Sequence, residues 1–249
     1  MTDVVRVFLG FDPREAVAYH VCCQSIIEST SVPVAFYPVH RGLLKDFDGQ
    51  RDGTNAFTVS RYLIPHLCDY KGWAIFMDGD MFCRGDIADL WEMQREYVFD
   101  KAVAVVKHDY RTKHSRKYVG TDMENSNVDY PKKNWSSVML WNCAHFANRI
   151  LSPEYVSEAP VGSLHRLEWL HPSQIAELPK EWNHLVGEEA PKTSSLYHFT
   201  LGIPGIKHYT ADYGAWRWHG ALMRALECAG EDQLKVVERS YQAAGLARL

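Results

Sequence analysis

The sequence predicts an α/β protein with a mixed, mainly parallel sheet flanked by helices. Strand-like apolar runs alternate with helical spacing through the first half of the chain, which is typical of strands joined by crossover helices. Residues 73–77 (WAIFM) are apolar at nearly every position, and residues 102–106 repeat this pattern. Strands of this kind are usually covered by helices on both faces, so we expect the sheet to lie in the middle of the molecule.

Each predicted element follows from a local pattern. Short apolar or β-branched runs bounded by polar turns predict strands at residues 4–9, 34–39, 73–77, 102–106 and 138–141. Helical apolar spacing predicts helices at residues 14–28 and 57–67, with Pro65 near the end of the second, and a terminal helix at residues 233–249. Polar composition predicts loops at residues 41–55 and 108–134.

The length and composition indicate a single globular domain over residues 1–249, with a C-terminal helical segment from about residue 211. A chain of 249 residues that is 46% apolar and 23% charged can bury a sizeable core. No internal repeat, low-complexity tract or linker divides it. The net charge of −4 argues against a nucleic-acid partner, because such proteins usually carry a basic patch for phosphates.

The cysteines and the apolar runs bear on the cellular setting. None of the six cysteines forms a Cys-x-x-Cys pair, so neither a zinc ribbon nor a thioredoxin-type site is expected. No run of 18 apolar residues and no signal peptide is present, so we expect a cytoplasmic protein without a transmembrane segment. The aromatic, basic stretch at residues 216–219 leaves peripheral membrane association open, although a packed amphipathic helix is the simpler interpretation.

The strongest functional signal is a pair of carboxylates, Asp78 and Asp80, separated by Gly79 directly after the buried strand at residues 73–77. In open α/β sheets, ligands bind beyond the carboxyl ends of the strands. Two carboxylates there suit Mn²⁺ or Mg²⁺, which prefer carboxylate and phosphate oxygens. A plain turn is the alternative, because Asp and Gly are common turn residues.

Residues 73–91 resemble the metal-binding segment of GT-A fold glycosyltransferases, in particular glycosyltransferase family 8, which includes glycogenin and bacterial galactosyltransferases. Those proteins also carry an apolar strand, an Asp-x-Asp, a short strand and a Leu-Trp ending, here Leu90-Trp91. The resemblance implies a GT-A-like, Rossmann-like sheet. It also implies a donor site in which Asp78 and Gly79 contact the nucleotide-sugar and Asp80 takes part in catalysis.

Two further segments match the family before the acid pair. Residues 8–12 (FLGFD) resemble the family's first strand and nucleotide-binding turn, which places Phe11 and Asp12 at the base and ribose. Arg61 lies in the predicted helix where relatives carry an arginine that reaches the donor.

The remaining matches lie in the last third of the chain. His198 resembles the histidine that completes the family's metal site, so the implied ligands are Asp78, Asp80 and His198. Gly202, Gly205 and Lys207 follow it, as do the residues that hold the diphosphate in relatives. Gln174 resembles the family's glutamine beside the reacting sugar and is therefore a candidate catalytic residue.

The function that these observations indicate is a metal-dependent glycosyltransferase of the family 8 type. It would move a hexose from a UDP-sugar to a saccharide or another hydroxyl acceptor, with retention of configuration. Two alternatives stay open: a sugar-nucleotidyltransferase, and a non-catalytic relative that binds sugars or nucleotides.

The basic side chains of the polar segment at residues 107–133 allow two interpretations. Its lysines and arginines either grip an anionic donor or acceptor, or are ordinary solvated loop residues. We expect the segment to be mobile without ligand and to shape the acceptor side of the site, because it contains few apolar residues with which to pack.

Overall fold

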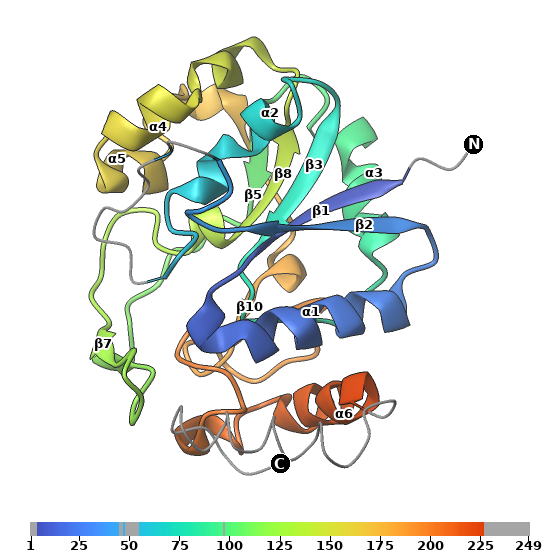
Figure 1. The fold of residues 1–249 in the computed structure, drawn as a ribbon, viewed down its shortest axis with the longest axis vertical. Helices are drawn as coiled ribbons and strands as arrows, with labels where there is room; N and C mark the ends of the chain where they lie inside the picture. Colours follow the sequence, from blue (N-terminus) through green and yellow to red (C-terminus); the bar gives the residue numbers. More distant parts are fainter. Residues whose placement is uncertain (1–3, 45–46, 48–54, 97, 227–249) are drawn as a thin grey trace.

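The protein folds around a mixed, mainly parallel sheet, as the sequence predicts, and this sheet has a sixth strand that the sequence did not indicate. The computed structural model describes residues 4–44, 47, 55–96 and 98–226 (Figure 1). In spatial order the strands are β2 (Val34–Val39), β1 (Val5–Gly10), β3 (Trp73–Met77), β8 (Val138–Asn142), β5 (Val103–Val105) and β9 (Ile175–Glu177). Strand β8 runs antiparallel to both of its neighbours, and the other pairs are parallel.

Two smaller sheets lie beyond the main one. The first joins β10 (His184–Leu185), β11 (Leu196–His198) and β4 (Met81–Cys83), with β11 antiparallel to β4. The second is the hairpin of β6 (Arg116–Lys117) and β7 (Asn125–Ser126). The first of these sheets brings the chain after β3 next to a segment more than a hundred residues later, which matters for the site.

Helices cover both faces of the main sheet (Figure 1). On one face, α1 (Ala16–Ser29) and α3 (Ile87–Glu96) pack on alternate residues of β1 and β3. The opposite face packs against α2 (Ile64–Leu67), α4 (Pro153–Glu158) and α5 (Val161–His165). A further helix, α6 (Ala215–Leu226), lies against the outer side of α1.

Short 3₁₀ helices link the regular elements. Their bounds are η1 (Pro13–Glu15), η2 (Ser60–Leu63), η3 (Trp135–Ser137), η4 (Phe146–Ile150), η5 (Pro172–Gln174), η6 (Lys180–Trp182) and η7 (Lys207–Tyr209). No helix within the described residues is long and apolar enough to cross a membrane.

The predicted strands agree with the structure to within a residue or so at each end, but two other predictions need correction. Residues 57–67 do not form one helix: η2 is followed by the single turn of α2, because Pro65 has no backbone N–H and can stand only in a first helical turn. Residues 108–134 are not only loop, since they contain the β6–β7 hairpin, whose Tyr118 and Met123 are buried against other apolar side chains. Of the predicted C-terminal segment, α6 begins at Ala215, and residues 233–249 lie outside the described residues.

Candidate functional site

The two aspartates and His198 come together at the carboxyl edge of the main sheet. Asp78, Gly79 and Asp80 connect β3 to β4, and β4 pairs with β11 so that Met81 lies opposite His198. The carbonyl oxygen of Asp80 also accepts a hydrogen bond from the backbone N–H of Phe199 (3.0 Å). As a result, one ligand atom from each of Asp78, Asp80 and His198 lies within 4.8 Å of the others.

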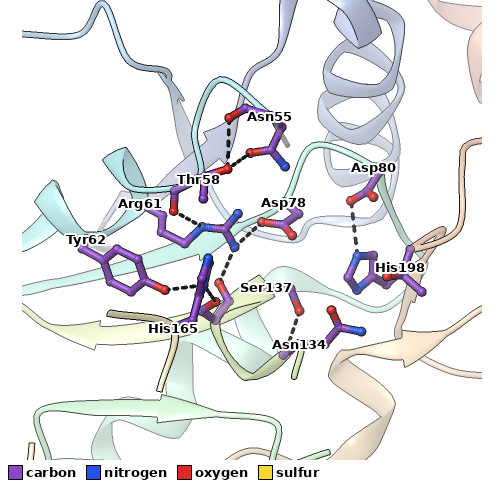
Figure 2. Close-up of polar contacts among 12 residues, drawn as sticks. Asn55, Thr58, Arg61, Tyr62, Asp78, Asp80, Asn134, Ser137, His165 and His198 are labelled. Atoms are coloured by element: carbon purple, nitrogen blue, oxygen red, sulfur yellow. Dashed lines mark hydrogen bonds and ion pairs between the residues drawn. The ribbon is translucent and has the colours of Figure 1, made fainter. Parts of the chain in front are cut away.

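A chain of hydrogen bonds through Asn183 fixes the ring of His198. The other side of the ring faces Asp80 (Figure 2). Ser137 Oγ donates to the carbonyl oxygen of Asn134 (2.7 Å), so it accepts from Asn183 Nδ2 (2.8 Å). The amide of Asn183 therefore turns its Oδ1 toward His198 Nδ1 (3.0 Å), which must carry the ring proton of the neutral imidazole. His198 Nε2 is left with a lone pair, 3.4 Å from Asp80 Oδ1.

These residues fit a divalent cation. Two electron-rich atoms that face each other, His198 Nε2 and Asp80 Oδ1, need a positive charge between them, and Asp80 Oδ1 is buried without a hydrogen-bond partner. Two carboxylates and one imidazole whose other nitrogen is hydrogen-bonded form a donor set that suits Mn²⁺ or Mg²⁺.

Arg61 is committed to Asp78. Its guanidinium lies 2.8 Å from Asp78 Oδ1, donates to the carbonyl oxygen of Ser136 (2.9 Å), and rests over the rings of Phe57 and Phe76. Burial raises the pKa of Asp78, and Arg61 acts in the opposite direction. Arg61 is only 4% exposed and lies next to the aspartates, and its contact with the donor remains a prediction.

A narrow polar cavity of about 100 Å³ opens in front of these side chains. Its walls include the turn after β3, η2, η3, α5, β11 and the β6–β7 hairpin, and they combine charged groups with hydroxyls and amides. The charged and imidazole side chains that line this cavity are Arg61, Asp78, Asp80, Lys117, His165 and His198.

A wider cavity of about 590 Å³ adjoins the first through Asn55, which lines both. Phe11, Asp12, His40 and Arg41 form part of its wall. The carboxylate of Asp12 is only 3% exposed and accepts hydrogen bonds from Arg14 and from the backbone N–H of Ala56. These bonds outweigh burial and lower the pKa of Asp12, so it holds the wall of the cavity as an ionised group.

Gln174 lies away from the site. It ends η5, its Oε1 accepts from the backbone N–H of His171 (2.9 Å), and its carbonyl oxygen accepts from Ala102 (2.9 Å). Because β5 and β9 are parallel, Gln174 stands at the edge where these strands begin, opposite the edge that carries Asp78. The prediction that Gln174 faces the reacting sugar is therefore not supported by its position.

The segment after His198 also differs from the expectation. Residues 201–206, which include Gly202 and Gly205, are buried, and their apolar side chains pack with α1 and α6. Lys207 is exposed at the start of η7 and is absent from the described side chains that line the polar cavity. The long, apolar turn between Thr200 and Lys207 carries that lysine past the site.

The structure gives particular places to three further residues. Lys117 belongs to the basic segment that we expected could grip an anion, whereas the sequence patterns missed His165. Lys117 enters the cavity from β6, and its Nζ donates to Thr200 Oγ1 (2.9 Å). Asn183 lies directly after η6 and orients His198 through the contact between its Oδ1 and His198 Nδ1. His165 Nδ1 contacts Tyr62 Oη (2.8 Å) and Ser136 Oγ (3.0 Å), and nothing in its local sequence marks it.

Comparison with solved structures defines the class of fold. WbbM, a bifunctional glycosyltransferase, aligns with a TM-score of 0.62 at 15% identity over 96% of this chain and 52% of its own, so this chain spans about half of WbbM. The galactosyltransferase LgtC, in complex with donor and acceptor sugar analogs, aligns with a TM-score of 0.55 at 12% identity over 92% of this chain and 98% of its own. The chain has the GT-A glycosyltransferase fold.

Comparison of sequences defines the family. Protein CDI of Arabidopsis thaliana is 40% identical over 212 residues, which cover 80% of this chain and 78% of that protein. This chain therefore belongs to the family of Protein CDI. No family model matches the chain.

Proposed function

We propose that this chain is a metal-dependent glycosyltransferase that moves a hexose from a UDP-sugar to a hydroxyl acceptor. The observation that carries the proposal is the group formed by Asp78, Asp80 and His198, placed where a 590 Å³ cavity meets a small polar one. A nucleotide-sugar has the matching sequence of parts: a base and ribose, a diphosphate, and a sugar.

Each part has a counterpart among the described residues. The base and ribose fit the wider cavity beside Phe11 and Asp12, where His40 and Arg41 offer further polar contacts. The diphosphate would lie at the two aspartates and Gly79, together with the divalent ion. The sugar would enter the polar cavity, whose hydroxyl, amide and imidazole groups match a polyol.

The chemistry follows from the charge on the leaving group. A bound Mn²⁺ or Mg²⁺ supplies Lewis-acid stabilisation of the departing diphosphate. Asp78, Asp80 and His198 would hold that ion, and Asn183 keeps the His198 lone pair directed at it. Arg61 limits the negative charge of the pair by remaining 2.8 Å from Asp78.

Retention of configuration is part of the proposal. The carboxylates that line the polar cavity, among the described residues, are Asp78 and Asp80, and both belong to the candidate metal site. A double displacement needs a separate carboxylate nucleophile. A front-face route, in which the departing phosphate accepts the proton of the acceptor hydroxyl, needs none.

An acceptor could reach the polar cavity from a neighbouring cavity. Tyr130 lines the polar cavity and also a third cavity of about 350 Å³, whose wall includes Tyr110, Arg111 and Lys132. A saccharide lying there could stack on tyrosine rings and present a hydroxyl past Tyr130.

The test combines binding and turnover. We expect release of UDP from UDP-hexoses to require Mn²⁺ or Mg²⁺, and Asp80→Asn to lose metal-dependent UDP binding while it keeps the wild-type melting temperature. The exposed Asp122 on the β6–β7 hairpin provides the control Asp122→Asn. UDP binding by Asp80→Asn as tight as that of wild type would remove Asp80 from the metal site.

The two alternatives give different results in the same assays. A sugar-nucleotidyltransferase would form a nucleotide-sugar from a nucleoside triphosphate and a sugar phosphate, releasing pyrophosphate. A non-catalytic relative would bind UDP-sugars with metal and release nothing. Either result would replace the proposed transferase activity.

A further inference from the structure

One cation at the polar cavity, Lys117, has no ionic partner among the residues that the structure describes. Apart from histidines, the cationic side chains that line the cavity, as far as the chain is described, are Arg61 and Lys117. Arg61 is paired with Asp78. Lys117 Nζ donates to the neutral hydroxyl of Thr200 (2.9 Å) and forms no ion pair with a described carboxylate.

The backbone holds Lys117 in this place. The N–H of the next residue, Tyr118, donates to the carbonyl oxygen of Leu201 (2.7 Å), three residues beyond His198. Tyr118 and Met123 are 7% and 8% exposed and pack in the apolar cluster shared by α1 and α6. The hairpin is therefore fastened to the segment that follows β11, and Lys117 lines the same polar cavity as Asp78, Asp80 and His198.

The electrostatic setting favours an anion beside this lysine. Burial lowers the pKa of Lys117, whereas Asp80 and Asp78 act to raise it, so the ammonium group lies within the field of both aspartates. With a divalent ion on those aspartates, their charge would be neutralised, and the ammonium group would need a new anionic partner.

We propose that Lys117 binds the diphosphate of the donor and stabilises the charge that develops on it when the sugar leaves. This inference rests on the proposed function and deepens it. It assigns to a lysine of the β6–β7 hairpin the role that motif resemblance gives to Lys207, which is exposed at the start of η7.

The role follows from the charge balance of the transfer. The bond between the anomeric carbon and the diphosphate oxygen breaks, and its electron pair stays on that oxygen. The acceptor oxygen bonds to the same carbon, and its proton passes to the departing diphosphate. Lys117 keeps its own protons and donates hydrogen bonds to diphosphate oxygens, and these bonds strengthen as negative charge grows there.

The experiment compares lysines in full-length protein. Calorimetry with Mn²⁺ would measure the affinity of Lys117→Met, Lys117→Arg and Lys207→Met for UDP and for uridine, which lacks the diphosphate. Turnover of UDP-hexose would give kcat and KM for the same set. Lys113→Met, at an exposed side chain of the same segment, is the matched control, and melting temperatures report on folding.

We expect Lys117→Met to weaken UDP binding by about 10- to 100-fold, because a charged hydrogen bond is lost, and to leave uridine binding within twofold. Its kcat/KM should fall by about 10²- to 10³-fold, as when a donor to a developing oxyanion is removed. Lys117→Arg should recover part of both losses, because it keeps the charge. Lys207→Met should change each quantity by much less than Lys117→Met.

Three results would overturn the inference: wild-type UDP affinity in Lys117→Met, an equal loss of UDP and uridine binding, or a larger loss in Lys207→Met. A different result would contradict the proposed glycosyltransferase function. If wild type binds UDP with Mn²⁺ but never transfers or hydrolyses the sugar, the transferase proposal falls, while the binding comparison still decides the role of Lys117.

Discussion

A Cβ atom on Gly79 would overlap the carbonyl oxygen of Gly10. The turn between the two aspartates therefore rests directly on the end of β1. Phe11 and Asp12 follow Gly10, so one backbone contact joins the wall of the wide cavity to the candidate metal ligands. The glycine between Asp78 and Asp80 is needed for this close approach.

We predict that Gly79→Ala weakens metal-dependent UDP binding by about tenfold or more, because the backbone must shift to make room for the new Cβ atom. In well-aligned active sites, a displacement of about 1 Å can lower the reaction rate roughly 10²-fold. The free energy of unfolding should fall by about 1–3 kcal/mol, as in other overpacked sites. Calorimetry and thermal melting measure the two effects. Gly220→Ala in α6 is the control, since its Cβ would meet only the end of the Arg224 side chain, at 3.1 Å. Wild-type binding by Gly79→Ala would show that the contact is unimportant for the site.

The hydrogen bond from His198 to Asn183 gives a second prediction. Asn183→Leu removes the acceptor of the His198 Nδ1 proton, so we expect the affinity for Mn²⁺ to fall about 10- to 100-fold, as for other residues that orient a metal ligand. Electron paramagnetic resonance of free Mn²⁺ measures this directly.

The control for that variant is Asn148→Leu. Asn148 is equally buried, at 0% exposed, but bonds to the carbonyl oxygens of Ala102 and Asn142, at the opposite edge of the sheet. Both variants should lose stability, and only Asn183→Leu should lose affinity for Mn²⁺. Equal affinities would mean that Asn183 only supports the fold.

The pH dependence of stability should carry a contribution from His165. Burial, followed by the charges of Arg61 and Arg166, lowers the pKa of His165 to about 3. Between that pH and about 6.5, the usual pKa of histidine, the unfolded chain binds a proton that the folded chain does not. Stability therefore rises with pH through this window, by up to about 1.4 kcal/mol per unit for one group, and is fully present above pH 6.5.

His165→Asn keeps an acceptor for Tyr62 and Ser136 but removes this titration. We expect its stability to depend less steeply on pH between 4 and 6 than that of wild type, measured by denaturant unfolding at each pH. Nuclear magnetic resonance titration of the His165 ring provides the direct check. A ring that titrates near 6.5 would contradict the prediction.

Hydrogen exchange tests the segment of residues 107–133. Lys117, Tyr118 and Asn125 line the polar cavity, and the two strands of their hairpin have only two residues each. We predict slower exchange in this segment when UDP and Mn²⁺ bind, because ligand contacts add to a short ladder of backbone bonds. Exchange in β3 serves as the internal reference. Strong, equal protection of residues 107–133 in both states would identify an ordered structural insertion instead.

The central strands of the sheet were predictable because they are continuous apolar runs, whereas β9, with only three residues, was not predicted. Residues 73–77 and 138–141 are buried on both faces, and no other element accommodates such runs as well. The hairpin at residues 116–126 was not predictable, because strands of two residues leave no alternating pattern. Its position depends on Tyr118 and Met123 packing against helices distant in sequence.

The candidate site also contains residues that the sequence could predict and residues that it could not. The aspartates and His198 lie on or next to strands whose pairing is set by apolar patterning, so motif resemblance placed them together. Gln174 and Lys207 lie beyond short connections, where a difference of a few residues moves a side chain to another edge or to the surface. Which lysine enters the cavity is decided by tertiary packing, and local sequence does not contain that information.

The pairing of β4 with β11 has a consequence for how the protein is made. Asp80 leaves the ribosome well before His198, its neighbour across the small sheet. A nascent chain that stops short of β11 exposes two carboxylates with no imidazole opposite them and no Asn183–His198 bond. A metal site built from Asp78, Asp80 and His198 is therefore complete only after most of the polypeptide has been synthesised.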